Sequence, residues 1–434
     1  MKDNYVLFWH RRDLRIEDNI GLHKALTSGS KVIPMFIFDT DILDKLPKDD
    51  ARVNFIHEEL KKIHQTLKDA HDVSFMVQHG NPLKVLEALI SEYKISAIYT
   101  NHDYEPYAIA RDAEVKEFLA TQNVAFHSFK DQVIFERDEI VKADGKPYTV
   151  YTPYSRKWLA TLQESHYESV NCAEHYGNFA KIQIDFPSLE TIGFTISSIK
   201  VLPYKMTETL IEGYEGTRNF PGIEGTSRLS PHLRFGTVSV RQCVQNGLRS
   251  EENTFLKELI WREFFMQILW HFPKSVTNNF RSKYDGIQWR NNEEDFKAWC
   301  EGNTGFPLVD AGMRELNKSG YMHNRVRMLT ASFLCKHLLI DWKWGEAYFA
   351  KKLLDFDLAQ NVGNWQWVAG TGCDAAPYFR IFNPTTQIQK FDKEHNYIKK
   401  WVPDYQEFTY PKQIVDHKFA RERCLETYKA GIEG

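Results

Sequence analysis

The feature that most constrains the fold is a change of hydrophobic pattern part-way along the chain. Short apolar runs alternate with segments of helical periodicity in the first part, at 5–9, 32–38, 73–77, 95–100 and 125–129. From about residue 204 onward only the helical periodicity remains. Alternating strands and helices are typical of a parallel sheet covered on both faces. We therefore expect an N-terminal Rossmann-like α/β domain followed by a C-terminal all-α domain.

The expected helices divide the chain in the same way. In the first part they span 19–28, 52–68, 82–93 and 106–121; in the second part they span 238–246, 254–271, 293–300, 307–319, 326–339 and 345–354. Residues 131–203 lack strong periodicity, and a connection of that length is uncommon inside a compact domain. Because 434 residues exceed one ordinary core, we expect two domains, 1–130 and 204–434, joined by an interdomain connector over 131–203.

Charge and aromatic content are distributed unevenly. Residues 1–200 carry 24 Lys+Arg against 30 Asp+Glu, whereas residues 201–434 carry 31 against 28. The small positive excess is compatible with a basic groove but does not establish DNA binding. Nine of the eleven tryptophans lie at or beyond Trp261, which favours a planar ligand in the second part, although large helical cores also collect tryptophan.

The sequence also excludes several classes of protein. Its six cysteines include no Cys-x-x-Cys pair, which is typical of free thiols in a reducing compartment. The opening apolar run is interrupted by Arg11 and Arg12, and no run reaches membrane-spanning length, so we expect a cytoplasmic protein. No metal site is expected, because Lys61 stands where a zinc-protease helix needs its second histidine.

Residues 355–367 combine two carboxylates, side-chain amides and two indoles in apolar surroundings. A stretch that only had to pack would not contain them, because buried polar groups must all find partners. Carboxylates and amides can satisfy the ring edge and ribose of a flavin or nucleotide. A capped helix start with two core tryptophans explains the same residues, and the stretch alone leaves both interpretations open.

Three other groups have both a functional and a structural interpretation. The hydroxyl-rich segment 225–231 suits a phosphate at a helix start, or an ordinary helix cap. Glu258 and Trp261 share one helical face, which can receive a nucleobase or place a salt bridge beside a core indole. Asn324 and Met328 also share a face, which suits a flat heteroaromatic ring or plain core packing.

In this order, the motifs resemble the photolyase/cryptochrome family along essentially the whole chain, and most closely the class I cyclobutane pyrimidine dimer photolyases. The matching segments are 8–15, 224–230, 258–264, 322–325, 355–359, 365–367 and 380–384. Any one of them is a weak signal. Seven in register over more than 370 residues are specific.

The resemblance implies FAD in the helical domain and a cavity for a flipped-out pyrimidine dimer. The FAD-binding positions are Tyr214, Thr226, Ser227, Arg228, Leu229, Ser230, Arg327, Asp355, Phe356, Asp357 and Asn361. The catalytic cavity comprises Glu258, Trp261, Asn324, Met328 and Trp367. The DNA-binding positions are Arg218, Arg262, Arg325 and Gln387. Electrons are expected to reach the flavin through Trp289, Trp342 and Trp365.

The implied activity is light-dependent repair of cyclobutane pyrimidine dimers by a carbon–carbon lyase that binds UV-damaged DNA as a monomer. Excited reduced FAD would donate an electron to the extruded dimer, whose ring bonds open before the electron returns. Three alternatives were weighed: a cryptochrome-type light sensor, a six-four photoproduct enzyme, and a flavin electron-transfer protein. Six-four enzymes carry histidines where Asn324 and Met328 stand here. Light sensors usually extend in a signalling tail, whereas about fifty residues follow segment 380–384 here and the cavity residues are all present. An electron-transfer protein does not need the Glu258 and Trp261 face.

Two departures from the family pattern affect the expectations. Phe255 stands where many relatives have a tryptophan near the flavin, so it is left out of the site. Tyr107 and Ala108 stand where folate-binding relatives have polar and acidic residues. A second, antenna chromophore of the deazaflavin or flavin type is therefore favoured over a folate, with Arg52 and Asp103 as its candidate ligands.

Overall fold

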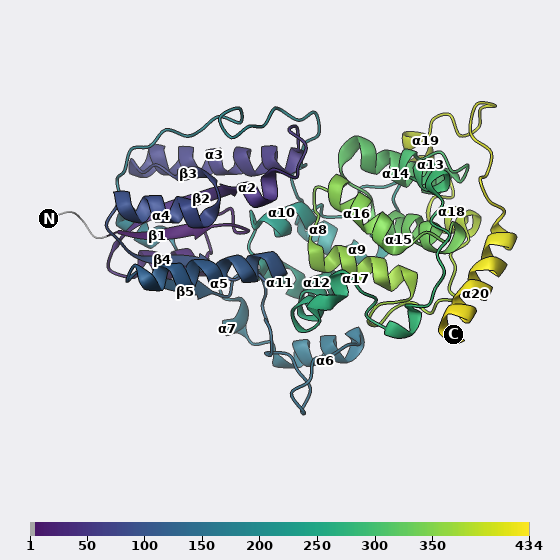
Figure 1. The fold of residues 1–434 in the computed structure, drawn as a ribbon, viewed down its shortest axis with the longest axis horizontal. Coiled ribbons are helices and arrows are strands. Elements are labelled where there is room, and N and C mark those ends of the chain that lie inside the picture. The colour runs from purple at the N-terminus through teal and green to yellow at the C-terminus, as the bar shows by residue number, and fades with distance from the viewer. Residues whose placement is uncertain (1–4, 434) are drawn as a thin grey trace. The chain divides into compact units, whose positions relative to one another are not determined.

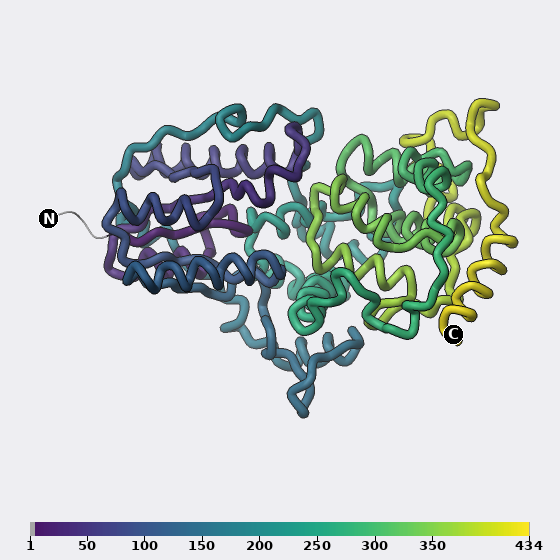
Figure 2. Tube along the Cα trace, in the orientation of Figure 1, coloured from purple at the N-terminus to yellow at the C-terminus, as the bar shows by residue number. Residues whose placement is uncertain are grey.

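The computed structural model describes residues 5–433 and confirms the predicted fold class, a parallel-sheet part followed by a helical part (Figure 1). Its contacts define two units, each drawn from separate segments of the chain, as the continuous trace in Figure 2 lets the reader follow. The α/β unit contains residues up to 136, 161–204 and 228–246; the helical unit contains 137–160, 205–227 and 247 onward. The three-part division expected from the sequence stays a prediction.

Within the described residues, the sheet of the α/β unit has five parallel strands in the order β3-β2-β1-β4-β5. The strands are β1 (Tyr5–His10), β2 (Lys31–Asp39), β3 (Met76–Gly80), β4 (Ile95–Asn101) and β5 (Ala125–Phe129). The strand order reverses at β1, which lies between β2 and β4. Ligands of such sheets bind beyond the carboxyl ends of the strands at this reversal.

Helices cover both faces of the sheet because successive side chains of a strand point to opposite sides (Figure 1). Val6 and Phe8 share a core cluster with α1 (Ile20–Leu26) and α3 (Ala51–His71). Leu7 and Trp9 share another with α4 (Pro82–Glu92) and α5 (Pro106–Thr121). The unit also contains α2 (Thr40–Leu43), α7 (Glu164–Tyr167), the 3-10 helix Ala173–Asn178, α10 (Ser230–Phe235) and most of α11 (Val240–Leu248).

The sequence placed the third strand too early, at 73–77. The ladder with β2 begins only where Met35 pairs with Met76. The preceding apolar residues are buried differently, because the Ser74 N–H donates to the carbonyl of Ile182 at 3.3 Å. An apolar run therefore marked burial correctly but not the start of sheet pairing.

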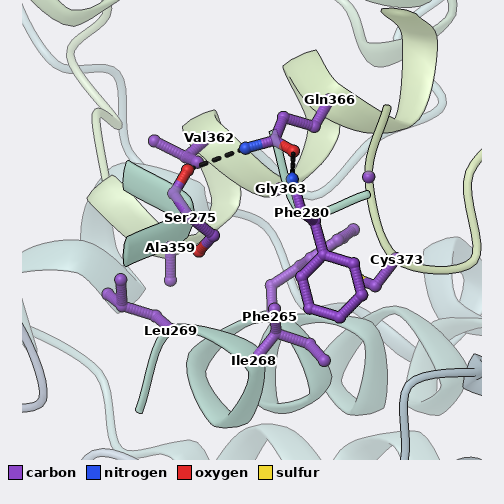
Figure 3. A pocket seen from close by; sticks show the side chains of 11 residues that line it. Phe265, Ile268, Leu269, Ser275, Phe280, Ala359, Val362, Gly363, Gln366 and Cys373 are labelled. Carbon is purple, nitrogen blue, oxygen red and sulfur yellow. Dashed lines mark hydrogen bonds between the residues drawn. The ribbon is translucent and has the colours of Figure 1, made fainter. Parts of the chain in front are cut away.

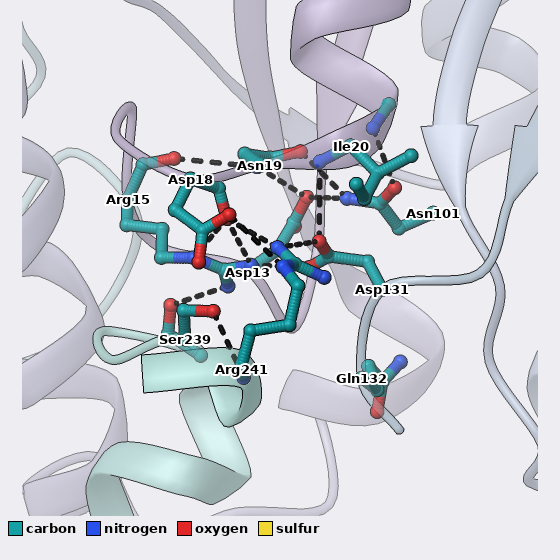
Figure 4. A network of polar contacts seen from close by, with 12 residues as sticks. Asp13, Arg15, Asp18, Asn19, Ile20, Asn101, Asp131, Gln132, Ser239 and Arg241 are labelled. Atoms are coloured by element: carbon teal, nitrogen blue, oxygen red, sulfur yellow. Dashed lines mark hydrogen bonds and ion pairs between the residues drawn. The ribbon is translucent and has the colours of Figure 1, made fainter. Parts of the chain in front are cut away.

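A buried ionic cluster inside the α/β unit centres on the carboxylate of Asp131 (Figure 4). Arg15 donates to one of its oxygens at 2.5 Å, and Arg241 donates to the other at 2.9 Å. Arg241 also donates through Nε to Asp18 at 2.9 Å. Burial alone would raise the pKa of Asp131, but the two guanidinium groups lower it below its ordinary value. The cluster ties the returning segment 228–246 to the N-terminal part of the sheet.

An amide network adjoins this cluster at the carboxyl end of β4 (Figure 4). The Asn101 side chain donates to Asp13 at 2.6 Å and to Asn19 at 2.8 Å. Asn101 also accepts from the N–H of Gly21 at 3.0 Å, where a Cβ on the glycine would lie 2.6 Å from the amide oxygen. The loop after β1 is therefore fixed by polar contacts and is not an open phosphate loop.

The helical unit consists of helices with no strand in its described part. Its helices are α6 (Tyr151–Thr161), α8 (Glu208–Glu212), α9 (Tyr214–Thr217), α12 (Thr254–His271), α13 (Glu293–Glu301), α14 (Pro307–Ser319), α15 (Asn324–Ser332), α16 (Trp342–Lys352), α17 (Leu358–Ala369), α18 (Pro384–Phe391), α19 (Asn396–Trp401) and α20 (His417–Glu433), with 3-10 turns at Pro273–Val276 and Ser282–Tyr284. The largest core cluster of the unit lies among α14, α15, α16, α17 and α19. Among residues 5–433, no helix is both long enough and apolar enough to cross a bilayer.

Two helices of this unit differ from the sequence-based expectation. Helix α6 lies inside the supposed connector, and its buried aromatic residues Tyr154 and Trp158 pack on α12. The helix expected over 326–339 ends at Ser332 and continues as a π-helical turn, Phe333–His337, in which the Leu338 N–H donates to Phe333. Such turns are frequent at functional sites.

Candidate functional site

The polar stretch at 355–367 forms the start and body of α17. The Asp357 side chain caps the helix by accepting from the N–H of Ala359 at 3.2 Å. The helix ends at Gly370, whose φ of +91° lies in the left-handed region that glycine adopts without strain. The capped helix start anticipated as the plain interpretation is therefore present. Capping by Asp357 does not exclude a ligand, because one of its oxygens suffices for the cap.

Asn361 and Trp365 lie on the face of α17 that packs against α16. The Asn361 amide nitrogen donates to the Glu346 carboxylate at 2.8 Å and to its carbonyl at 3.1 Å. Burial raises the pKa of Glu346, while the hydrogen bond from Asn361 opposes the rise. The described contacts of Asn361 use its nitrogen, and its side-chain oxygen can accept from a donor such as a flavin ring N–H. Glu346 was missed by the sequence reasoning because it lies fifteen residues away on another helix.

Arg327 and Asp355, expected as a pair, form a two-pronged ion pair with N–O distances of 3.1 and 2.8 Å. The Arg327 Nε also donates to the carbonyl of Met322 at 2.7 Å. Burial by itself would lower the pKa of Arg327, but Asp355 raises it above the ordinary value. Bidentate pairs of this kind fix orientation as well as charge. A partly buried guanidinium held in place is suited to stabilise negative charge on a neighbouring ring.

The expected phosphate segment begins where Gly225 closely approaches Thr217, the last residue of α9. A Cβ on Gly225 would lie 2.6 Å from the Cβ of Thr217, so only glycine fits. The Thr217 hydroxyl donates to the carbonyl of Gly225 at 3.2 Å, and the Thr226 hydroxyl lies 3.5 Å from that of Tyr321. This packing leaves backbone and hydroxyl groups at Thr226 and Ser227, which suit phosphate oxygens.

The remaining residues expected to bind the cofactor belong to both units. Tyr214 belongs to α9 and packs edge-on against Phe255, with ring centroids 5.5 Å apart. Arg228, Leu229 and Ser230 belong to the α/β unit, where Arg228 adopts a φ of +52° and Ser230 begins α10. A left-handed arginine is unusual and marks a tightly specified turn.

Glu258 and Trp261 lie together on α12, as their spacing predicted. The Glu258 carboxylate pairs with Arg218 at 2.6 Å, and both side chains are partly exposed. The surrounding protein raises the pKa of Glu258 by removing water from the carboxylate, and Arg218 opposes the rise. The indole of Trp261 is stacked flat against Tyr151, with centroids 3.6 Å apart and planes 4° apart. The contact between Tyr151 and Trp261 was not predicted from the sequence.

Positive charge gathers in the same unit around Arg325. Burial lowers its pKa, and Arg218 and Arg380 lower it further by repulsion. The guanidinium lies 4.4 Å from the ring centre of Phe391 and donates to Asn219 at 2.5 Å. Like-charged groups held near one another are suited to bind phosphates, which relieve the repulsion.

The other predicted positions near these arginines have modest contacts. The Asn324 amide lies 3.9 Å from the sulfur of Met328, as expected for neighbours one turn apart. Arg380 lies in the matching segment 380–384 but is not among the predicted site residues. Its guanidinium lies 6.0 Å from the ring centre of Trp367. Arg262 offers its carbonyl to Gln360 at 2.8 Å, and Gln387 is half-buried on α18.

The three tryptophans of the expected electron chain belong to the core of the helical unit. Trp365 packs edge-on against Phe349 at 5.0 Å, and Trp342 donates its indole N–H to Asn279 at 2.9 Å. Trp289 is half-buried and packs on Tyr428 at 5.8 Å. Their order as an electron path stays a prediction.

A small, mostly apolar cavity lies between α12 and α17 (Figure 3). Ala359, Val362 and Gln366 line it from the face of α17 opposite to Asn361. Figure 3 shows Gln366 spanning the cavity wall, where its amide donates to the Ser275 carbonyl at 2.7 Å. The cavity therefore belongs to the packing of the two helices and not to the face with the buried acid and amide.

In the α/β unit, the two predicted antenna ligands are each engaged in an ion pair of their own. Arg52 pairs with Asp50 at 2.6 Å. Asp103 pairs with Arg12 at 3.2 Å, and that guanidinium holds the pKa of Asp103 well below its usual range although burial opposes this. The described contacts do not bring Arg52 and Asp103 into one cluster.

A different group lies at the carboxyl ends of the strands. The Tyr107 hydroxyl donates to Asp39 at 2.6 Å, and burial raises the pKa of that aspartate despite the hydrogen bond. Arg11 and Arg111 lie 5.1 and 4.9 Å from the ring centre of Trp9. Such an arrangement of aromatic, cationic and acidic groups at the reversal point of a parallel sheet suits a planar polar ligand.

Comparison with known families decides the identity of the fold. The family model for DNA photolyase matches residues 6–172, and the model for the FAD binding domain of DNA photolyase matches residues 255–409. The chain belongs to the DNA photolyase family. A deoxyribodipyrimidine photo-lyase of Synechococcus sp. is 37% identical over 437 residues, covering 94% of this chain and 90% of that protein.

Two solved photolyase structures share the fold over nearly their whole length. A bacterial class III photolyase from Agrobacterium tumefaciens has a TM-score of 0.90 at 34% identity, covering 100% of this chain and 99% of that one. An archaeal photolyase from Sulfolobus tokodaii, described with two FAD molecules, has a TM-score of 0.83 at 33% identity, covering 98% and 100%.

These comparisons confirm the predicted family and the predicted enzyme class, a deoxyribodipyrimidine photolyase that takes part in DNA repair. They also confirm that the helical part contains a photolyase-type FAD-binding domain. The assignment to class I stays a prediction, because one structural neighbour is named a class III enzyme.

Proposed function

We propose that this photolyase repairs cyclobutane pyrimidine dimers in DNA, in a light-dependent reaction on a dimer flipped out against the face of α12 that carries Glu258 and Trp261. The observation that carries the proposal is the pairing of Glu258 with Arg218 next to the indole of Trp261. This face presents an acid, a cation and an aromatic plane together. A pyrimidine pair needs hydrogen bonds for its carbonyl edges and an apolar surface for its rings.

The residues of the helical unit fit a bound flavin. Asn361 presents a carbonyl oxygen, and the Arg327–Asp355 pair presents fixed charge, so donors and acceptors of a flavin ring edge would both find partners. When bound, reduced FAD would supply the electron that opens the cyclobutane ring under light and would take it back. Thr226 and Ser227, with Tyr214, would hold the phosphates and ribityl chain.

The protein's part in the reaction is to bind and orient the dimer and to stabilise its transient charge. Glu258 would hydrogen-bond the pyrimidine edge, and burial, which raises its pKa against the effect of Arg218, favours the protonated form that can donate to a carbonyl. Asn324 would donate a second, and Met328 and Trp367 would close the cavity. Arg325, Arg262, Arg380 and Gln387 would bind the flanking phosphates. Trp289, Trp342 and Trp365 would carry an electron inward to restore the reduced flavin.

An antenna chromophore of the flavin or deazaflavin type belongs to the same proposal. The Sulfolobus tokodaii relative is described with two FAD molecules and with a novel light-harvesting cofactor. In this chain Tyr107 and Asp39 would join the predicted ligands Arg52 and Asp103 around such a chromophore. Action as a monomer in the cytoplasm, predicted from the sequence, is part of the proposal as well.

The proposal is tested by illuminating the purified flavoprotein with an oligonucleotide that contains one thymine dimer, and following loss of the dimer by chromatography. A dark sample and an oligonucleotide with a six-four photoproduct serve as controls. We expect repair of the dimer in the light alone. Repair of the six-four lesion in its place, or light-independent loss of the dimer, would contradict the proposal.

A further inference from the structure

The stack between Tyr151 and Trp261 is the closest ring contact on the α12 face. The two planes are nearly parallel and the centroids lie 3.6 Å apart, so the rings overlap almost completely. Aromatic pairs left to themselves prefer offset or edge-on arrangements. A full overlap therefore indicates that the surrounding structure holds the tyrosine in this position.

Helix α6 holds the Tyr151 ring in place, through contacts at both of its ends and along one face. The Tyr151 hydroxyl donates to the carbonyl of Lys257 at 2.9 Å, and the Tyr151 backbone N–H donates to the Asp374 carboxylate at 3.0 Å. One turn on, Tyr154 packs on Phe264 with centroids 5.3 Å apart. These contacts fix the start of α6 against α12 over the turn that carries Trp261.

The far end of α6 is fixed more firmly still. The indole N–H of Trp158 donates to the carboxylate of Glu263 at 2.6 Å, and both side chains are buried. Separating a buried carboxylate from its hydrogen-bond donor costs free energy, because the carboxylate is then left without a partner and away from water. Since Tyr151, Tyr154 and Trp158 recur at helical spacing, a single face of α6 carries all three anchors. The tyrosine ring therefore cannot turn away from Trp261 without moving the helix.

We propose that Tyr151 is a positioning residue that fixes the plane of the Trp261 indole for the extruded pyrimidine pair. The proposal rests on the function proposed above and deepens it. Phe264 and Phe265 also pack on the indole, each with ring centroids 5.6 Å away. With one face covered by Tyr151, the pyrimidines can use only the part of this half-buried ring that the three aromatic neighbours leave exposed. The tyrosine thereby selects one direction of approach and removes the freedom of the indole before the ligand arrives, and such preorganisation improves binding.

The test measures the affinity of the FAD-loaded protein for a thymine-dimer oligonucleotide and for the same oligonucleotide undamaged, at one fixed salt concentration. Phosphate contacts determine the second affinity and do not involve the stack. We expect Tyr151→Leu to lower the ratio of the two affinities by roughly three- to tenfold, as loss of an aromatic pair predicts. Affinity for undamaged DNA and the visible absorption of FAD should stay unchanged.

Three further variants make the result specific. Tyr151→Phe keeps the stacked ring and should keep the affinity ratio within about twofold of the original. Leu159→Ala, on the exposed side of α6 and outside the three anchors, should leave the ratio unchanged. In the presence of Trp261→Ala, Tyr151→Leu should lower the ratio no further, because the two residues act through one contact.

The outcomes separate this inference from the proposed function. If the unaltered protein shows no preference for the dimer, the proposed function itself fails. If it does, and Tyr151→Leu lowers both affinities equally or adds its full effect to that of Trp261→Ala, only the positioning role is overturned. Loss of FAD from both Tyr151→Leu and Tyr151→Ala would likewise overturn it, because it would show a purely structural role.

Discussion

Lys336 allows a quantitative prediction, because it is a buried amine without a described carboxylate partner. The side chain is 1% exposed, belongs to the π-helical turn and donates to the carbonyl of Arg380 at 2.9 Å. Burial lowers the pKa of Lys336 to about 8 from 10.5, and Arg380 adds to this, while the thiols of Cys335 and Cys424 oppose it. The substitution Lys336→Met keeps the volume of the side chain and removes its charge.

The direction in which the stability of the folded state changes with pH follows from the two pKa values of Lys336, folded and unfolded. Between pH 8 and 10.5 the folded protein holds fewer protons on Lys336 than the unfolded chain does. The stability of the folded state therefore rises with pH through this window. At pH 7 the charged, buried amine destabilises the fold by about 3 kcal/mol relative to an unshifted lysine. Methionine loses the hydrogen bond to Arg380, about 1 kcal/mol, but this loss does not depend on pH.

The assay is urea unfolding at pH 7, 8, 9 and 10, followed by tryptophan fluorescence, which reports mainly on the helical part. We expect the stability of Lys336→Met relative to the original protein to fall by about 2 to 3 kcal/mol between pH 7 and pH 10. Lys351→Met, on the exposed side of α16, should show a pH-independent difference. If the stability difference between Lys336→Met and the original protein also stayed constant from pH 7 to pH 10, the reasoning would be refuted.

Three other predictions follow from single contacts. Glu258→Ala should lower the yield of repair more than it lowers dimer binding, and equal losses would remove its proposed role. Because the raised pKa keeps the acid protonated to higher pH, light-driven repair should fall as pH rises through that pKa. Glu258→Gln should abolish this pH dependence in the same assay. Arg241→Met should destabilise the protein by about 3 to 5 kcal/mol in urea unfolding, because Asp131 loses one of its two cations, and a change below 1 kcal/mol would contradict this. Asn361→Ala should speed dark reoxidation of the reduced flavin, followed by absorption, and an unchanged rate would separate Asn361 from the ring.

Much of the fold could be predicted because periodicity and end signals coincide in many elements. The expected bounds of α5, α12, α14 and β5 match the structure residue for residue. Helix α6 was missed because three aromatic residues at helical spacing are its main signal, in a segment that otherwise lacks strong periodicity. The π-helical turn could not be predicted because it depends on one backbone bond to Phe333 and not on composition.

The candidate site could be predicted where its residues share one helix, as Glu258 and Trp261 do. The assignment of Arg327 to Asp355 came from the family resemblance, since 28 residues separate them and no spacing rule joins them. Glu346 and Tyr151 were not found, because each contacts the site from a separate helix. Only packing between helices reveals such partners.

The attachment of segment 228–246 to the α/β unit has a consequence for how the chain is made. Arg241 completes the cluster around Asp131, so the N-terminal sheet cannot finish folding until about 246 residues have left the ribosome. By then the aromatic face of α6 has already emerged, whereas α12, on which it packs, has not yet left the ribosome. The nascent chain therefore exposes Tyr151, Tyr154 and Trp158 to the cell for the time needed to translate α12, which makes this interval the point at which a chaperone would most affect the yield.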